Sequence, residues 1–182
     1  MGKFKQIEAT LKDGRKVIIR EALVDDAANF LECLKEYIPQ SEFIPKLEHE
    51  INLSIKDKGD LINSYSEKSN SILLVAEFNH QIIGNIDLTG SNRKVMEHTA
   101  VIGMGMKKEW KNTGLGTALL TAAIDWAKEN SILQMLWLQV YNENNLALGL
   151  YKKMGFEESA TIKNFFKHGE RYFDNVTMTL KV

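Results

Sequence analysis

The stretch Lys111-Asn112-Thr113-Gly114-Leu115-Gly116-Thr117 decides the fold prediction, because it joins an apolar strand pattern at residues 99–106 to a helical pattern that runs to about Asn130. The first N–H groups of a helix have no internal partner, and the helix dipole adds partial positive charge there. A glycine-rich loop at this point therefore predicts a site for a phosphate or pyrophosphate. Gly114 and Gly116 carry no Cβ and would let a ligand approach the backbone closely. The same pattern also occurs in simple tight turns, so the rest of the chain has to decide.

The composition fits one ordinary globular domain over residues 1–182, with 44% hydrophobic and 26% charged residues. The formal net charge of −1 gives no reason to expect bulk electrostatic binding to nucleic acid. Cys33 is the single cysteine, and no Cys/His cluster has zinc spacing, so no metal is expected. The N-terminus lacks the apolar core of a signal peptide, and no apolar run approaches the roughly 18–20 residues of a membrane helix. We therefore expect a cytoplasmic protein that contacts neither membrane nor nucleic acid.

The chain begins with a predicted hairpin and a helix. Residues 4–10 and 16–20 are extended patterns on either side of the turn signal Lys12-Asp13-Gly14, and the β-branched second strand is expected to be central in the sheet. A helix then starts at Val24-Asp25-Asp26, with an Asp as its N-cap, and stops before Pro39.

A second helix, less apolar and expected on the surface, covers about residues 47–64. Its surroundings are acidic, which indicates either a solvated face or a rim that attracts a cationic substrate; the acidic residues are Glu48, Glu50, Asp57, Asp60 and Glu67. The apolar stretches 71–78 and 81–88 flank Asn79-His80, which predicts a tight hairpin.

The second half alternates strands and helices. Its elements after the loop helix are a strand at 135–140, a helix at 144–154 ended by Gly155, strands at 156–161 and 172–180, and a loop at 167–170 between them. The strand at 135–140 has almost no polar residue and is expected to be buried on both faces. Strand–helix–strand order should place neighbouring strands parallel around right-handed crossovers. The predicted fold class is α/β: a mixed, mostly antiparallel sheet with helices on both faces.

Two further features accompany the loop. Gly103 and Gly105 are costly inside a strand and indicate a bulge or the close approach of a ligand. In the later helix, four residues at positions i, i+3, i+4 and i+7 share one face: Asn144, Ala147, Leu148 and Tyr151.

Here the sequence resembles the GCN5-related N-acetyltransferases (GNAT). Their acetyl-CoA motif is Arg or Gln, two residues, Gly, one residue, Gly or Ala, and this chain has Lys111-Asn112-Thr113-Gly114-Leu115-Gly116. Their later motif is Asn, two residues, Ala, two or three residues, Leu-Tyr, then Gly-Phe, and this chain has Asn144, Ala147, Leu150-Tyr151 and Gly155-Phe156. The resemblance is best from residue 98 to 156, and the order of elements extends it over the chain.

The resemblance implies how acetyl-CoA would bind. The loop N–H groups would hold the pyrophosphate, and a splayed edge of the strand before the loop would pair with the pantetheine arm. Lys111 replaces the usual Arg or Gln and loses the planar fork. The implied cofactor-binding residues are Met104, Met106, Lys111, Asn112, Thr113, Gly114, Leu115, Gly116, Thr117, Asn144, Ala147 and Tyr151.

The resemblance also implies catalytic roles. The backbone N–H near Met104 would polarise the thioester carbonyl. Tyr151 would protonate the departing thiolate as general acid, although a packing tyrosine is the alternative. Asn144 would hold the pantetheine or cap its helix.

The general base stays open. Many relatives have a Glu on the strand before the loop, where this chain has Val101. His98 at the start of that strand is the titratable substitute; Glu97, Glu42 and Glu143 are weaker candidates, and an ordered-water relay is a further one.

The acceptor site is the least defined part of the prediction. Glu42 and Asp174 are candidates to border it, with a structural hydrogen bond as the alternative for Asp174. Cys33 is expected to be a buried core thiol.

The resulting hypothesis is transfer of the acetyl group of acetyl-CoA to a primary amine by direct attack in a ternary complex. The acidic stretch favours a small cationic amine as acceptor. The alternatives are a protein N-terminal acetyltransferase and, in another class, a non-catalytic CoA-binding module. A homodimer is an expectation at the level of the family.

Overall fold

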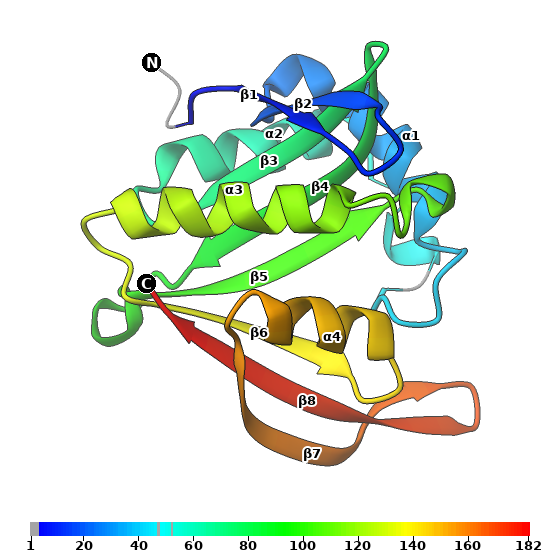
Figure 1. Cartoon of the computed structure of the whole chain (residues 1–182), viewed down its shortest axis with the longest axis vertical. Helices are drawn as coiled ribbons and strands as arrows, with labels where there is room; N and C mark the ends of the chain where they lie inside the picture. Colours follow the sequence, from blue (N-terminus) through cyan, green and yellow to red (C-terminus); the bar gives the residue numbers. More distant parts are fainter. Residues whose placement is uncertain (1–3, 47, 52) are drawn as a thin grey trace.

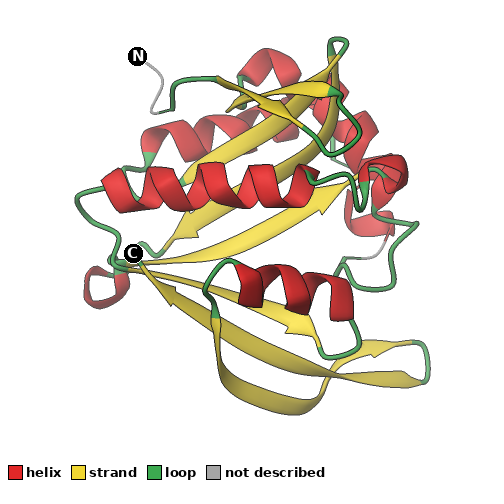
Figure 2. Cartoon of the chain, in the orientation of Figure 1, coloured by secondary structure: helices red, strands yellow, loops and turns green. Residues whose placement is uncertain are grey.

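The computed structural model describes residues 4–46, 48–51 and 53–182. One eight-stranded sheet runs through the protein in the order β1-β2-β3-β4-β5-β6-β8-β7 (Figures 1 and 2). The strands are β1 (Ile7–Thr10), β2 (Lys16–Glu21), β3 (Ile72–Phe78), β4 (Gln81–Gly90), β5 (Thr99–Met106), β6 (Met135–Tyr141), β7 (Glu157–His168) and β8 (Arg171–Lys181). The helices are α1 (Ala27–Tyr37), α2 (Ile55–Glu67), α3 (Leu115–Glu129) and α4 (Asn145–Lys153), with 3-10 turns η1 (Val24–Asp26), η2 (Glu48–Ile51), η3 (Lys94–Met96) and η4 (Lys108–Trp110).

Helices cover both faces of the sheet (Figure 1). The larger apolar core lies between the sheet and α3 and α4, and contains Leu119, Leu120 and Tyr151. A second core lies between the other face and α1 and α2, and contains Phe30 and Ile62. Only the β5–β6 pair is parallel; the other six pairings are antiparallel. The predicted mixed, mostly antiparallel sheet with helices on both faces is confirmed.

The crossover prediction holds for one connection and fails for the other. β5, α3 and β6 form the expected unit with neighbouring parallel strands. β7 does not pair with β6, because β8 inserts between them and pairs antiparallel with both. The hairpin connection between β7 and β8 keeps these two strands together, so the pair can enter the sheet only with one of them next to β6.

Several element boundaries differ from the sequence prediction. β2 lies one strand from the edge of the sheet, not at its centre. α2 starts only after Ser54, whose hydroxyl accepts from the Asp57 N–H; the predicted start at residue 47 lies outside the described residues. β7 continues past its predicted end at Thr161 and reaches His168, inside the predicted loop. β6 is not buried on both faces, since Gln139 is exposed and Trp137 half-buried.

The two β-hairpin turns in the first half follow the prediction. Asn79 and His80 both have positive φ angles, 49° and 62°, as the tight turn between β3 and β4 requires. Gly14 has φ 83° in the turn between β1 and β2.

Arg20 ties β2, β3 and the start of α1 together. Its guanidinium donates to both carboxylate oxygens of Asp26, at 2.7 and 2.8 Å, and to Glu77 at 2.9 Å. Asp26 stands at the N-cap of α1 but does not cap it; its Oδ2 accepts instead from the Leu23 N–H. Burial alone would raise the pKa of Asp26, but the hydrogen bonds from Arg20 and Leu23 outweigh it and lower that pKa.

Replacing Arg20 with Met should reduce the free energy of unfolding at pH 7 by about 2 kcal/mol. This loss is smaller than the loss for breaking a fully buried ion pair, because these side chains are about a fifth exposed. The lowered pKa of Asp26 means that its stabilisation exists above the carboxyl's unfolded pKa and is lost as the pH falls through the folded value. The destabilisation should therefore shrink towards acid pH. Urea unfolding at pH 7 and pH 3 measures this. Lys16→Met, in an exposed pair with Glu8, is the control and should cost much less stability than Arg20→Met; an equal loss in both variants would contradict the prediction.

Candidate active site

β5 and β6 pair over only three residues and then separate. The pairs are Thr99 with Met135, Ala100 with Leu136, and Val101 with Trp137. Beyond them the two strands diverge towards the end of β5 that leads into the glycine loop (Figure 1). The rest of β5 keeps its pairing with β4, down to Met106 opposite Gly84. One edge of β5, from residue 102 to 106, is therefore open on the side of β6.

The backbone groups of Met104 and Met106 point to this open edge. The Lys107 N–H donates to the Ile83 carbonyl of β4 at 2.9 Å, and the β4–β5 register is continuous. Neighbouring residues of a strand direct their N–H and C=O groups to opposite sides, so Gly103 and Gly105 bond towards β4. Met104 and Met106 then face the space from which β6 has withdrawn. An extended ligand can pair there as an added strand would.

The predicted loop presents unpaired N–H groups beside that edge. Gly114 has φ 97° and stands at the N-cap of α3, and Asn112 has φ 63°. In the described part of the chain, no acceptor meets the N–H groups of Asn112, Thr113, Gly114, Gly116 and Thr117; the first helical bond runs from the Ala118 N–H to the Gly114 carbonyl. The Leu115 N–H meets the Thr113 hydroxyl at 3.4 Å, and the Leu115 side chain is fully buried. The loop is thus anchored by one core residue while its donors remain available.

The N-terminal hairpin holds the loop, which the sequence alone did not reveal. The Lys12 N–H donates to the Thr113 carbonyl at 2.8 Å. The Arg15 guanidinium lies 3.7 Å from the ring centre of Trp110, which is buried just before the loop. The Lys12 side chain passes beside Gly114, where a Cβ would lie 3.4 Å from its Cγ. Lys12 therefore adds a cation next to the free N–H groups, together with the predicted Lys111.

α3, β5 and α4 meet at Gly116. A Cβ at this residue would lie 3.2 Å from both Met106 Cε and Leu150 Cδ2, and 3.8 Å from Met104 Cε. The glycine therefore allows the start of α3 to pack closely against the open edge and against α4. This contact brings the two sequence motifs together in space.

The predicted face from Asn144 to Tyr151 is present on α4, and the structure defines the role of Asn144. Asn144 caps α4, since its Oδ1 accepts from the Ala147 N–H at 3.2 Å. Tyr151 is 8% exposed and packs edge-on against Phe156 at 5.8 Å. Burial raises the pKa of Tyr151 to about 12. Its hydroxyl has no hydrogen-bond partner among the described residues, so it is available to a ligand.

The glycines of β5 serve a purpose other than the predicted bulge. The register between β4 and β5 shows no shift. A Cβ at Gly105 would lie 2.4 Å from the Tyr37 ring, and one at Gly103 would lie 2.7 Å from Asp87 Oδ1. The glycines thus leave room for side chains that cross β5 from α1 and β4. The bulge interpretation is wrong because it treated the strand without its neighbours.

The candidate bases named from the sequence lie away from the open edge at Met104. His98 and Glu97 precede β5 at its paired end, where the His98 carbonyl accepts from the N–H groups of Gln134 and Met135. His98 lies six positions before Met104, which is about 20 Å along an extended chain. Glu97 pairs with Lys94 at 2.6 Å. Glu143 lies exposed in the turn between β6 and α4.

Glu42 and Asp174, the predicted acceptor residues, both have structural partners. Asp174 accepts from Lys163 at 2.6 Å and from the Asn164 N–H at 3.0 Å. Glu42 is exposed and lies 3.5 Å from Arg171 of β8. Next to it, Phe43 packs against Tyr141 at the end of β6 with ring centres 5.7 Å apart, in a cluster with Phe166 of β7 and Phe173 of β8.

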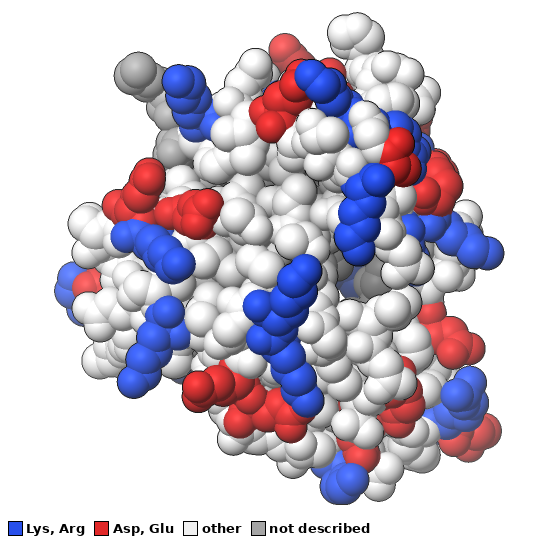
Figure 3. All heavy atoms as spheres, viewed as in Figure 1, with Lys and Arg blue, Asp and Glu red and all other residues white. Residues whose placement is uncertain are grey.

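Charge and pockets give no second candidate. Lysine, arginine and acidic side chains are interspersed on the face that carries α3 and α4 (Figure 3). The described residues hold no group of three or more His, Cys, Asp or Glu suited to a metal ion, and none of their helices is both long and apolar enough to span a bilayer. Two pockets, of about 100 and about 530 Å³, lie beside α2 and contain none of the predicted site residues. Cys33 is buried as expected, and burial raises its pKa to about 12.

An open strand edge beside free loop N–H groups is an arrangement that suits an elongated, phosphate-bearing ligand, and comparisons with known proteins specify the family. The sequence model of the acetyltransferase (GNAT) family matches residues 32–156. An N-alpha-acetyltransferase of Sulfurisphaera tokodaii is 30% identical over 104 residues, which cover 53% of this chain and 62% of that relative. The chain belongs to the acetyltransferase (GNAT) family.

Solved structures agree with this assignment. The crystal structure of a GNAT-family acetyltransferase from Streptococcus pneumoniae superposes with a TM-score of 0.86 at 29% identity, covering 91% of this chain and 99% of that one. The fold is shared with a GNAT superfamily phosphinothricin acetyltransferase from Sinorhizobium meliloti, which was solved in complex with acetyl-CoA. The two superpose with a TM-score of 0.77 at 16% identity, covering 96% of this chain and 89% of that one.

Proposed function

We propose that this protein transfers the acetyl group of acetyl-CoA to a primary amine by direct attack in a ternary complex. The observation that carries the proposal is the open edge of β5 directly beside the free N–H groups of the loop. Family membership and the acetyl-CoA complex of the Sinorhizobium meliloti protein support the choice of donor.

The residues present fit this donor. Five backbone N–H groups in the loop and the first turn of α3 have no acceptor among the described residues and suit a pyrophosphate, since such groups and the helix dipole both favour negative charge. Lys111 and Lys12 add positive charge at the rim of the loop. Met104 and Met106 offer backbone donors and acceptors to the amides of a pantetheine arm. When bound, acetyl-CoA supplies an activated acyl group on a thiol leaving group.

Two groups of the chain act on the reaction in this proposal. The Met104 N–H donates to the thioester carbonyl and stabilises the negative charge that develops on its oxygen. Tyr151, on α4 beside Leu150, donates to the departing sulfur. Asn144 caps the helix that carries Tyr151 and holds its first turn in place.

The proposed acceptor is a small cationic amine, with one competing candidate. Acidic residues on α2 lie exposed, although Asp57 and Asp60 are engaged locally by Ser54 and Lys56. The Sulfurisphaera tokodaii relative is an N-alpha-acetyltransferase, which favours a protein N-terminus as the second candidate.

Thiol release from acetyl-CoA in the presence of an amine panel tests the proposal. The panel comprises 1,4-diaminobutane, an aminoglycoside and a peptide with a free N-terminal alanine. We expect amine-dependent release with a turnover number above about 1 s⁻¹ for at least one class, within the usual range of enzymes. Release without amine serves as the background. If no amine raises the rate above background while calorimetry shows CoA binding, the protein is a non-catalytic CoA-binding module.

A further inference from the structure

The strand before the loop lacks the acidic side chain that a catalytic base would provide, but a neighbouring strand places a carboxylate over it. Asp87 of β4 pairs directly with Gly103 of β5. A Cβ at Gly103 would lie 2.7 Å from Asp87 Oδ1 and 3.3 Å from Oδ2. The carboxylate therefore occupies the space above β5 that a side chain at residue 103 would fill.

The two oxygens of Asp87 have different environments. Oδ2 accepts from the Thr89 hydroxyl at 3.0 Å and from the Tyr65 hydroxyl at 3.2 Å, and these two hydroxyls are 2.8 Å apart. Oδ1, the oxygen beside Gly103, has no hydrogen-bond partner in the described part of the chain. Asp87 as a whole is half-buried, so the carboxylate is not sealed from solvent. One oxygen is thus fixed while the other is free to accept from a ligand.

The neighbouring position on β5 is closed. The Tyr37 ring covers Gly105, which is buried, and its hydroxyl donates to Asn85 Oδ1 at 2.8 Å. Gly103 and Asp87 remain half-buried. On the α1/α2 side of the sheet, a ligand can therefore approach β5 at Gly103, the residue immediately before Met104.

We propose that Asp87 is the carboxylate that binds the acceptor ammonium and acts as its general base, a role moved from β5 to β4. The inference rests on the proposed function, since it assigns the acceptor side of the same site. It also explains both departures of β5 from the expected pattern. Val101 is not acidic because the carboxylate comes from the next strand, and residue 103 is a glycine because that carboxylate needs the space.

The surroundings of Asp87 suit a base that works near neutral pH. Burial raises the pKa of its carboxyl above the usual range, and hydrogen bonds from Thr89 and Tyr65 offset part of that rise. The charged groups that face it are Lys58 of α2 and Lys46 of the preceding loop, and both favour the ionised form. Tyr65 and Tyr37 face it as well, and burial raises their pKa values, so both stay neutral. A raised carboxyl pKa brings the base closer to the pKa of the ammonium it must deprotonate.

The proton balance of the step is complete. Asp87 Oδ1 takes one proton from the ammonium, and the freed lone pair on nitrogen forms the C–N bond at the carbonyl carbon. The Met104 N–H holds the oxygen while the C–S bond breaks and the sulfur leaves with its electron pair. Tyr151 gives the sulfur a proton and recovers one from the newly bonded nitrogen. The net release is the single proton on Asp87.

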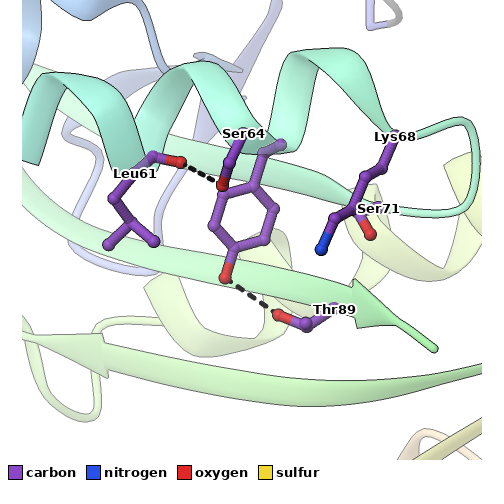
Figure 4. Close-up of a pocket in the computed structure, with 6 residues that line it drawn as sticks. Leu61, Ser64, Lys68, Ser71 and Thr89 are labelled. Carbon is purple, nitrogen blue, oxygen red and sulfur yellow. Dashed lines mark hydrogen bonds between the residues drawn. The ribbon is translucent and has the colours of Figure 1, made fainter. Parts of the chain in front are cut away.

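That proton has a route to solvent. The Tyr65 and Thr89 hydroxyls line a pocket of about 100 Å³, together with the polar side chains of Ser64, Lys68 and Ser71 (Figure 4). Leu61 completes the lining, and a pocket of this size that also presents hydroxyl groups has room for water. The hydroxyl pair therefore links the other oxygen of the same carboxyl, Oδ2, to this pocket, and the proton reaches that side when the neutral carboxyl rotates.

The test compares Asp87→Asn with wild-type protein and with Asp125→Asn, an exposed change on α3. We expect Asp87→Asn to lower kcat at least about 100-fold, the lower range for loss of a general base, with acetyl-CoA affinity within about twofold of wild type. The acid limb of the wild-type kcat/KM profile should lie above the ordinary carboxyl pKa of about 4 and should be absent in Asp87→Asn. Asp125→Asn should match wild type throughout. Turnover of Asp87→Asn within about threefold of wild type, or an unchanged acid limb, would overturn the proposal.

Two further measurements cover the other outcomes. If Asp87→Asn does not fold, Gly103→Ala takes its place: the added Cβ displaces Oδ1 while β4 stays intact, and turnover should fall at least about 30-fold. A wild-type rate in that variant would count against Asp87. If wild type acetylates no amine, the proposed function fails, and 1,4-diaminobutane is titrated calorimetrically into the CoA-bound protein. Asp87→Asn should then weaken binding at least tenfold; equal binding, or none by wild type, overturns the role of Asp87.

Discussion

Replacing Tyr151 with Phe should lower kcat by at least about 100-fold while leaving the affinity for acetyl-CoA within about twofold of wild type. The loss of a positioned proton donor costs about 10²–10⁴ in rate. Burial holds the pKa of Tyr151 at about 12, so the phenol keeps its proton at every pH of practical interest. A thiol has a pKa of about 8.5, so hydrogen-bond donation to the sulfur precedes any complete transfer.

This variant separates catalysis from stability. The Tyr151 hydroxyl has no partner among the described residues, and its ring packs against Phe156. Removing the hydroxyl leaves no buried group unsatisfied, so the free energy of unfolding should change by less than about 1 kcal/mol. Steady-state kinetics, calorimetric titration with acetyl-CoA and urea unfolding measure the three quantities. Tyr172→Phe, at a 53% exposed tyrosine of β8, is the control. Unchanged turnover of Tyr151→Phe across the pH range would remove the phenol from the mechanism.

Replacing Gly114 with Ala should weaken acetyl-CoA binding at least tenfold. Gly114 has φ 97°, where an alanine is strained by about 1–3 kcal/mol. The nearest atom to the new Cβ would be Lys12 Cγ at 3.4 Å, so backbone strain and not a clash drives the effect. The loop can relieve the strain only by rotating the peptides whose N–H groups converge on the ligand.

The matched control is Gly149→Ala in α4. Gly149 has no positive φ, and nothing lies within 4 Å of its would-be Cβ. This change should raise stability by up to about 1 kcal/mol through helix propensity and leave binding unaltered. Calorimetry and urea unfolding are performed on both variants. Should Gly114→Ala bind acetyl-CoA as tightly as wild type, the loop would not be the pyrophosphate site.

The backbone features of the proposed donor half could be predicted from sequence because their signals are local. The loop conformation depends on Asn112 and Gly114, two positions apart in the chain, and the cap of α4 depends on Asn144 and Ala147, three positions apart. Helix and hairpin signals of this kind act over a few residues, so the order of elements and the fold class followed from the pattern. Element ends were less secure, as the late start of α2 and the long β7 show.

The proposed acceptor half could not be predicted from the sequence, because it is built from pairs of residues that only the folded sheet brings together. Asp87 and Gly103 are 16 positions apart and meet through the β4–β5 register, and Tyr65 reaches Asp87 from α2. The bulge interpretation of Gly103 was wrong for the same reason, since the register with β4 shows no shift.

The sequence by itself determined the element order, the phosphate-type loop and the Asn144–Tyr151 face, since each rests on backbone preferences and periodicities within one segment. The tertiary structure alone decided three things: the insertion of β8 between β6 and β7, the support of the loop by Lys12 and Arg15, and the placing of the Asp87 carboxylate above Gly103. The physical reason is that strand register and packing depend on the sum of many weak, distant contacts, which no single stretch of the chain encodes.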